Sequence, residues 1–108
     1  MANPWLERRV IGYAHQAGEK EAPSSTLYAI ERALAVGMTG IELDVHATRD
    51  GALVVGHDAT LERTTNGAGT ISGCVLDEIR QLDNAYWFVP GEATVHDRPA
   101  DQYVFRGK

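Results

Sequence analysis

Apolar and ionisable residues alternate from Ile41 to His46, in the order Ile-Glu-Leu-Asp-Val-His. Successive side chains of a β-strand point to opposite faces, so this pattern predicts a strand over residues 41–48 with one apolar and one ionisable face. Acidic residues are depleted in strands, and a buried carboxylate requires a cation, a metal ion or hydrogen bonds. The pattern therefore favours a cation held between Glu42 and Asp44.

A short apolar run over residues 10–14 predicts an earlier strand, with His15 at its carboxyl end. A polar loop follows, and Ser24 or Ser25 is the expected N-cap of a helix that starts just after Pro23. Three apolar residues recur at the spacing of one helical face, before a glycine that is suited to end the helix: Leu27, Ile30, Leu34 and then Gly37. Strand, helix and strand in this order indicate a βαβ unit with parallel strands.

Asp50 and Gly51 separate two β-rich runs and predict a tight hairpin, because its central residues need positive φ. With these two residues at the centre, Asp44 faces His57 across the hairpin, on the face that carries Glu42. A bulge would shift this register by one residue.

The remainder of the chain gives weaker signals. A short helix is expected over residues 76–82, without a good capping residue, and residues 84–108 have no period and are expected to form an irregular loop. Trp87 is expected in the core rather than at a substrate lip, because aromatic side chains bury large areas. Asp58 either orients an imidazole or caps a turn, and His46 is expected to line the site without reacting.

A parallel strand pair normally belongs to a sheet that is covered on both faces. The chain has 108 residues, whereas a (β/α)₈ barrel of the TIM type needs roughly 250. We therefore interpret residues 1–108 as a single partial α/β domain, the N-terminal portion of such a barrel. An exposed barrel edge predicts oligomerisation.

Composition excludes several other classes. The net charge of −5 offers no basic surface for nucleic acid, so no nucleic-acid partner is expected. No apolar run approaches the roughly 20 residues of a transmembrane helix, and the first ten residues lack the apolar core of a secretory signal. The single cysteine, Cys74, cannot form an internal disulfide, which favours a cytoplasmic location.

The chain resembles the glycerophosphodiester phosphodiesterase family in a series of short motifs, in the family's order and approximate spacing, from about residue 10 to residue 82. The matching residues are Ala14-His15, Ala22-Pro23-Ser24-Ser25-Thr26, Gly40-Ile41-Glu42-Leu43-Asp44-Val45, Thr48-Arg49-Asp50-Gly51, Val54-Val55-Gly56-His57-Asp58 and Leu61-Glu62-Arg63-Thr64-Thr65-Asn66-Gly67. The combination is far more specific than any one motif.

This resemblance implies a (β/α)₈ barrel that hydrolyses glycerophosphodiesters to glycerol 3-phosphate and an alcohol. It implies that Glu42 and Asp44 hold a divalent cation, Ca²⁺ or Mg²⁺, and that His15 and His57 serve as acid and base. The partner is thus a small phosphodiester substrate. The leaving alcohol and the division of roles between the two histidines stay open.

Three departures from the family pattern matter. Gln16 stands where the family usually has an arginine that meets the phosphate, and it can bind substrate only through uncharged hydrogen bonds. Ser24 and Ser25 replace Glu and Asn of the usual Pro-Glu-Asn-Thr. A further carboxylate ligand, from a later strand, has no match here. Two alternatives to an active phosphodiesterase therefore remain: an inactive domain that needs a partner or the rest of the barrel, and a generic α/β binding domain.

Overall fold

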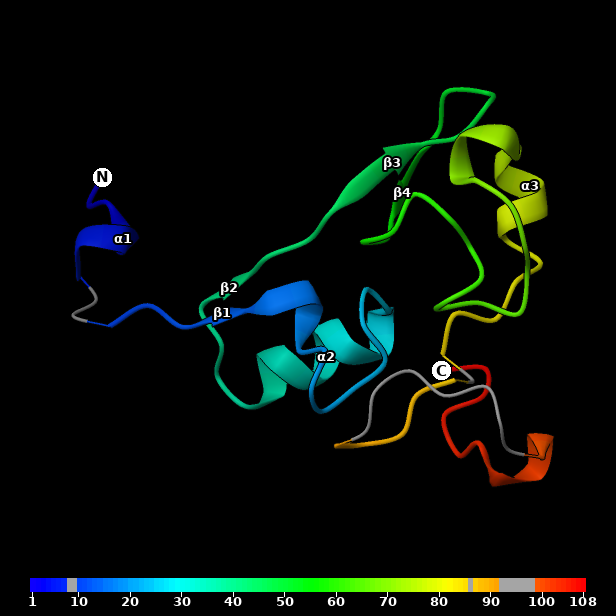
Figure 1. Ribbon diagram of the computed structural model, residues 1–108. Helices are drawn as coiled ribbons and strands as arrows, with labels where there is room; N and C mark the ends of the chain where they lie inside the picture. The colour runs from blue at the N-terminus through cyan, green and yellow to red at the C-terminus, as the bar shows by residue number, and fades with distance from the viewer. Residues whose placement is uncertain (8–9, 86, 92–98) are drawn as a thin grey trace.

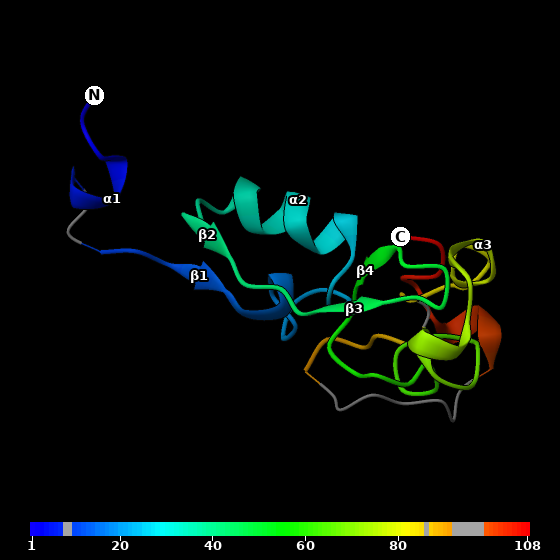
Figure 2. The same cartoon turned by 90° about the horizontal axis from the view of Figure 1, so that it is seen from above.

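The computed structural model describes residues 1–7, 10–85, 87–91 and 99–108. A short helix, α1 (Pro4–Glu7), lies at one end of the molecule, away from the other elements (Figures 1 and 2). The predicted βαβ unit follows as β1 (Tyr13–Ala14), α2 (Leu27–Ala35) and β2 (Gly40–Ile41). β1 and β2 pair in parallel, with Ala14 opposite Ile41, which confirms the parallel arrangement.

The strand predicted over residues 41–48 is interrupted. Gly40 and Ile41 belong to the sheet with β1, whereas β3 (Val45–Ala47) pairs antiparallel with β4 (Leu53–Val55). Residues 42–44 connect the two small sheets as one extended segment (Figure 1). The Glu42 N–H still donates to the Ala14 carbonyl at 3.1 Å, so this segment leaves one sheet just before it joins the other.

The hairpin register differs from the predicted one by one residue. Thr48 and Ala52 close a three-residue loop, in which Gly51 alone has a positive φ, of 83°. A three-residue loop with a left-handed residue is the next commonest hairpin after the two-residue turn. Asp44 consequently lies opposite Gly56, whose N–H donates to the Asp44 carbonyl at 3.0 Å, and the predicted pairing of Asp44 with His57 is wrong.

Helix α2 begins and ends by different means. Its N-cap is Thr26, whose Oγ1 accepts from the Ala29 N–H at 3.1 Å, so the prediction of Ser24 or Ser25 is wrong. Gly37, with φ of 88°, ends the helix as predicted. The Gly37 N–H donates to the Leu34 carbonyl and the following N–H to the Ala33 carbonyl, the hydrogen-bond pair of a Schellman motif.

The buried face of α2 consists of small residues. Ala29 and Ala33 are buried, and Ala29 packs in a core cluster with Ala17 and Ala22. Leu27 and Leu34 are 78% and 59% exposed, although their spacing predicted a core-facing stripe. The alanines allow the helix to lie close against the loop after β1. Ile30 of the predicted stripe also packs against this cluster, so only its two leucines face outward.

The second half of the chain builds a separate cluster. A 3₁₀ turn at Ile71–Gly73 leads into α3 (Leu76–Ile79), which is shorter than expected. Two carboxylates accept hydrogen bonds from the N–H groups at its start. Glu78, within the helix, accepts from Val75 at 2.9 Å, and Asp50, at the hairpin loop, accepts from Leu76 at 3.1 Å. These contacts replace the missing capping residue.

The described residues after Asn84 include a 3₁₀ helix, Ala100–Gln102, and otherwise form turns and irregular backbone, while residues 86 and 92–98 of the predicted loop lie outside the described residues. Trp87 and Phe88 are 5% and 2% exposed, as expected for core residues. Phe105 makes edge-to-face contacts with Phe88 and with Tyr28 of α2, at centroid distances of 5.2 and 5.7 Å. The end of the described chain therefore packs back onto the βαβ unit.

Candidate active site

His15 directly follows β1 and begins a 3₁₀ turn, His15–Ala17. Its Nδ1 lies 2.9 Å from Glu19 Oε1, and its Nε2 lies 3.9 Å from Glu42 Oε2. Gln16 and Ala17 have positive φ values of 48° and 62°, a conformation that costs free energy in non-glycine residues. This sharp bend brings His15 beside the acidic segment of the next strand.

Glu42 and Asp44 occupy the extended segment between the two sheets. Glu42 Oε2 accepts the Gln16 N–H at 3.1 Å, which fixes this carboxylate against the bend after β1. Asp44 Oδ2 is buried and has no hydrogen-bond partner among the described residues. A buried carboxylate oxygen in this state suits a hard cation, which binds oxygen ligands at about 2.0–2.6 Å.

The described residues contain no group of three or more His, Cys, Asp or Glu side chains that could hold a metal ion. Glu42 and Asp44 thus fit a divalent cation as two of its ligands, and they do not complete its coordination shell.

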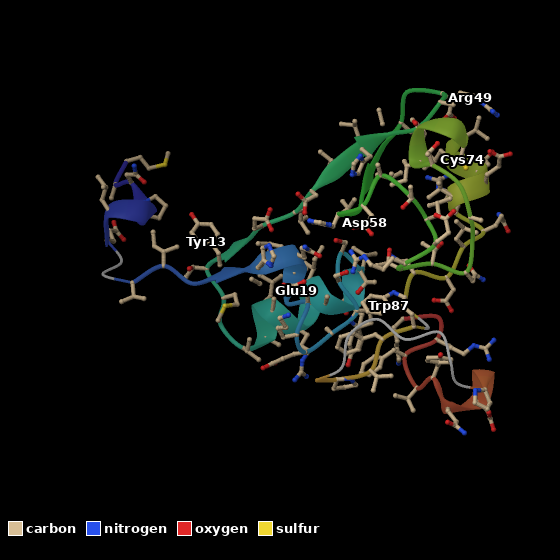
Figure 3. The ribbon with its side chains drawn as sticks, in the orientation of Figure 1. Tyr13, Glu19, Arg49, Asp58, Cys74 and Trp87 are labelled. Atoms are coloured by element: carbon tan, nitrogen blue, oxygen red, sulfur yellow. The ribbon has the colours of Figure 1, made fainter. Side chains whose placement is uncertain are left out.

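His57 follows β4 and forms the second half of the site. Its Nδ1 lies 2.7 Å from Asp58 Oδ1. Asp58 in turn accepts from the Nε and Nη2 atoms of Arg63, at 2.6 and 2.8 Å. Figure 3 shows Asp58 where the chain leaves the hairpin, and Glu19 in the loop after β1. Asp58 therefore orients an imidazole, one of the two roles that the sequence left open.

Electrostatics reflect this arrangement. The hydrogen bond to Asp58 raises the pKa of His57, and the negative charge of Asp44 raises it further. The Arg63 guanidinium holds the pKa of Asp58 far below its ordinary value. His46 contributes a separate contact, because its Nε2 lies 3.0 Å from the His57 carbonyl oxygen. It thus supports the backbone of His57 from the neighbouring strand.

The four predicted residues do not form one pocket. His15 Nε2 lies 3.9 Å from Glu42 Oε2, whereas the charge of Asp44 contributes to the raised pKa of His57. His15 lines a cavity of about 300 Å³ between β1 and α2, whereas His57 lines another of about 250 Å³, and neither is lined by Glu42 or Asp44. The described residues bring the two histidines to the same acidic segment but do not enclose them together.

Gln16, which the sequence suggested as a substrate ligand, is buried. Its side chain is 4% exposed, and Oε1 has no hydrogen-bond partner among the described residues. Ser25 Oγ is also buried without a hydrogen-bond partner among the described residues. The Ser25 N–H donates to the Gln16 carbonyl at 3.0 Å. These two departures from the family pattern are therefore neighbours in space.

Sequence reasoning named Asp58 beside His57, but it missed Glu19 as the partner of His15 and Arg63 as the partner of Asp58. Glu19 follows His15 by four residues, and Arg63 follows His57 by six. Only the bend after β1 and the folding of the loop after Asp58 bring these charged groups to the imidazoles. Arg63 does lie within one of the motifs that the chain shares with the family, Leu61-Glu62-Arg63-Thr64-Thr65. This motif was the one feature of the sequence that could have indicated a role for Arg63.

The model of the glycerophosphoryl diester phosphodiesterase family matches residues 15–104 of this chain. The chain belongs to this family. The match includes both histidines, both carboxylates of the extended segment, and Arg63.

Relatives agree with this assignment. The chain is 50% identical over 75 residues to a glycerophosphodiester phosphodiesterase from Caldanaerobacter subterraneus, covering 69% of this chain and 31% of that protein. It is 43% identical over 77 residues to human glycerophosphodiester phosphodiesterase 1, covering 71% and 23% respectively.

Solved structures show the same relationship. The chain resembles a glycerophosphodiester phosphodiesterase from Agrobacterium tumefaciens with a TM-score of 0.71 and 42% identity, over 73% of this chain and 35% of that one. It resembles an Oleispira antarctica phosphodiesterase, solved with the product sn-glycerol-3-phosphate, with a TM-score of 0.68 and 37% identity, over 72% and 32%. The chain thus spans about a third or less of these relatives, and it folds as part of a (β/α)₈ barrel.

Among the described residues, no helix has both the length and the apolar character needed to cross a membrane.

Proposed function

We propose that this protein hydrolyses glycerophosphodiesters to glycerol 3-phosphate and an alcohol, with His15 and His57 as the acid–base pair. Glu42 and Asp44 would hold a divalent cation, Ca²⁺ or Mg²⁺, which when bound neutralises phosphate charge and orients a glycerol hydroxyl. The observation that carries the proposal is that His15 Nε2 lies 3.9 Å from Glu42 on the Glu-x-Asp segment, whose Asp44 has a buried Oδ2 without a hydrogen-bond partner among the described residues. Membership of the phosphodiesterase family supports it.

The reaction requires two proton transfers, which the two imidazoles supply. The substrate's own 2-hydroxyl attacks phosphorus, and one histidine accepts its proton as the new P–O bond forms. The other histidine donates a proton to the alcohol oxygen as its bond to phosphorus breaks. Water then opens the resulting cyclic phosphate, and the two histidines exchange roles.

Gln16 is the proposed contact to a phosphate oxygen. Its carboxamide N–H groups can donate hydrogen bonds, but the residue brings no positive charge.

Replacement of either histidine tests the assignment. We expect His15→Ala and His57→Ala each to nearly abolish hydrolysis of glycerophosphocholine, because each variant lacks either the imidazole that accepts the first proton or the protonated imidazole that donates the second. The assay compares initial rates with added Ca²⁺ or Mg²⁺. His46→Ala is the matched control and should retain most of the rate, since its contact is with the backbone of His57. A variant of His15 or His57 that retains most of the rate would remove that residue from the mechanism.

These assays require a complete barrel, and a chimera supplies one. In it, this chain replaces the aligned region of the Caldanaerobacter relative, to which it is 50% identical. The 108-residue chain alone is the comparison, and we expect little or no turnover from it because the described residues hold no complete metal site. An inactive chimera that folds normally would favour the alternative of a non-catalytic domain.

The cellular setting is a further part of the proposal. The lone cysteine, Cys74, supports a cytoplasmic location, where thiols stay reduced. The open edges of the two small sheets support association with another chain or with further strands.

A further inference from the structure

Arg63 contacts the carboxylate beside His57, although no motif assigned it a role. The Arg63 guanidinium donates two parallel hydrogen bonds to Asp58, from Nε to Oδ2 at 2.6 Å and from Nη2 to Oδ1 at 2.8 Å. Such a fork fixes the position and the rotation of a carboxylate better than a single contact does. Asp58 Oδ1 also meets His57 Nδ1 at 2.7 Å, so the orientation of Asp58 determines that of the imidazole.

The other histidine has a similar contact of its own. His15 Nδ1 lies 2.9 Å from Glu19 Oε1, which repeats the contact of His57 with Asp58. His15 therefore provides an internal comparison for the effect of Arg63 on His57.

The loop that carries Arg63 is held at both of its ends. The Ile71 N–H donates to the Ala59 carbonyl at 2.9 Å, and the Leu61 N–H donates to the Gly69 carbonyl at 2.9 Å. Leu61 itself is 4% exposed, which anchors the residues just before Arg63. A guanidinium on this closed loop has a defined position relative to the hairpin.

We propose that Arg63 is a positioning residue for His57: it fixes Asp58, and so holds the His57 imidazole with Nδ1 turned to that carboxylate. Nε2 of the His57 ring then remains for the substrate, a consequence that rests on the proposed function. In the neutral rings Nδ1 carries the hydrogen and Nε2 the lone pair, because a carboxylate only accepts hydrogen bonds.

The planar fork sets the expected sensitivities, because lysine cannot reproduce its two parallel hydrogen bonds to Asp58. Arg63→Met, Arg63→Lys and Asp58→Asn should each release the His57 ring. His15, whose Nδ1 contacts Glu19, should keep its tautomer in all three variants.

Nitrogen-15 NMR of the 108-residue chain tests the proposal without any need for turnover, so its failure is distinct from failure of the proposed activity. Long-range proton–nitrogen spectra report which ring nitrogen carries the hydrogen, and they are recorded well above the usual imidazole pKa of about 6.5. His15→Gln and His57→Gln assign the signals. We expect both rings of the wild-type chain to show a single tautomer with hydrogen on Nδ1.

Arg80→Met is the matched control, because the Arg80 side chain is 68% exposed and its nearest carboxylate, on Asp77, is 3.8 Å away. It should leave both tautomers unchanged. Amide spectra establish whether each variant keeps the fold, and if Arg63→Met unfolds, the pattern in Arg63→Lys and Asp58→Asn decides. The proposal is overturned if the wild-type His57 ring populates both tautomers, or if His57 keeps its tautomer in the folded variants of Arg63.

Discussion

At the scale of single residues, the site depends on carboxylates whose own surroundings fix them. Asp58 keeps its charge because Arg63 binds both of its oxygens, and a charged Asp58 in turn favours a protonated His57. A hydrogen bond also stabilises the charged form of Asp50 at the hairpin tip. The Thr48 hydroxyl donates to Asp50 at 2.6 Å and lowers its pKa. Local hydrogen bonds, rather than burial, thus set the charges around the β3–β4 hairpin.

The Asp58 and His57 pair gives stability a pH dependence of known sign. The pKa of Asp58 is lowered in the folded chain, so its contribution is present above the unfolded value of about 3.9 and is lost as pH falls through the folded value. The pKa of His57 is raised, so its contribution is present below about 6.5 and is lost as pH rises through the folded value. We expect both contributions to be complete between roughly pH 4 and pH 6.5.

Denaturant unfolding of wild type and Asp58→Asn across this range measures the effect. The stability difference between the two proteins should be largest inside the window and should shrink on either side. Asp77→Asn, at a 90% exposed side chain, is the control and should give a small difference. A difference for Asp58→Asn that is constant with pH would contradict the assigned shifts.

The placement of the ionisable residues that alternate with apolar ones could be predicted from the sequence, because strand periodicity is a local property. Glu42 and Asp44 share an extended segment, and His15 follows a strand, as expected. Glu19 and Arg63 were not predictable from periodicity, because irregular loops carry them. Their positions depend on the bend at Gln16 and on the closed loop between Ala59 and Ile71.

At the scale of elements, the first turn of α2 shows why the N-cap prediction failed. Ser25 has φ of 59°, and its Oγ is buried without a hydrogen-bond partner among the described residues. Thr26, at φ −103° and ψ 156°, has the extended backbone that a capping residue requires. Residue type alone did not distinguish these two hydroxyls, because their roles depend on backbone dihedrals.

Alanine substitutions at these two positions give opposite expectations. Thr26→Ala should destabilise the chain by about 1 kcal/mol, since it removes the side-chain acceptor for the Ala29 N–H. Ser25→Ala is the matched control and should be neutral or slightly stabilising, because it deletes a buried hydroxyl that has no partner. Chemical denaturation measures both, and equal losses at the two positions would contradict the observed cap.

The strands illustrate a different limit of sequence interpretation. The period-two pattern correctly indicated extended backbone over residues 41–48, but it contains no information on which partner each residue pairs with. Gly40 and Ile41 pair with β1, and Val45–Ala47 pair with β4, so one apolar–polar pattern serves two sheets. The hairpin register failed for a related reason, since Asp50-Gly51 fits both two-residue and three-residue loops.

At the scale of the whole molecule, the chain has the dimensions of an open structure. Its radius of gyration is 15.5 Å, against about 13 Å for a compact domain of this length. Its extents are 47 × 34 × 18 Å, and the two sheets contain two strands each. The fold class was predictable because the βαβ order and the ordered motifs belong to a known architecture, which the chain covers only in part.

This open form exposes apolar surface that a closed barrel would cover. Leu27, Leu34 and Val36 are 78%, 59% and 61% exposed along α2 and its end, and Leu53 of β4 is 74% exposed. Burial of one leucine side chain contributes about 1.5–3 kcal/mol, so contact between two such faces favours association. We therefore expect the isolated 108-residue chain to self-associate, with a dissociation constant that sedimentation velocity can measure over a concentration series.

Leu34→Lys tests this expectation, because it replaces apolar surface with charge while leaving helix propensity nearly unchanged. Loss of one buried leucine from the interface should raise the dissociation constant by roughly 10- to 100-fold. Glu31→Lys is the control: it adds positive charge at another exposed position of α2 without removing apolar area, and it should leave association nearly intact. Equal effects of both variants would show that net charge, rather than the exposed leucine face, governs association.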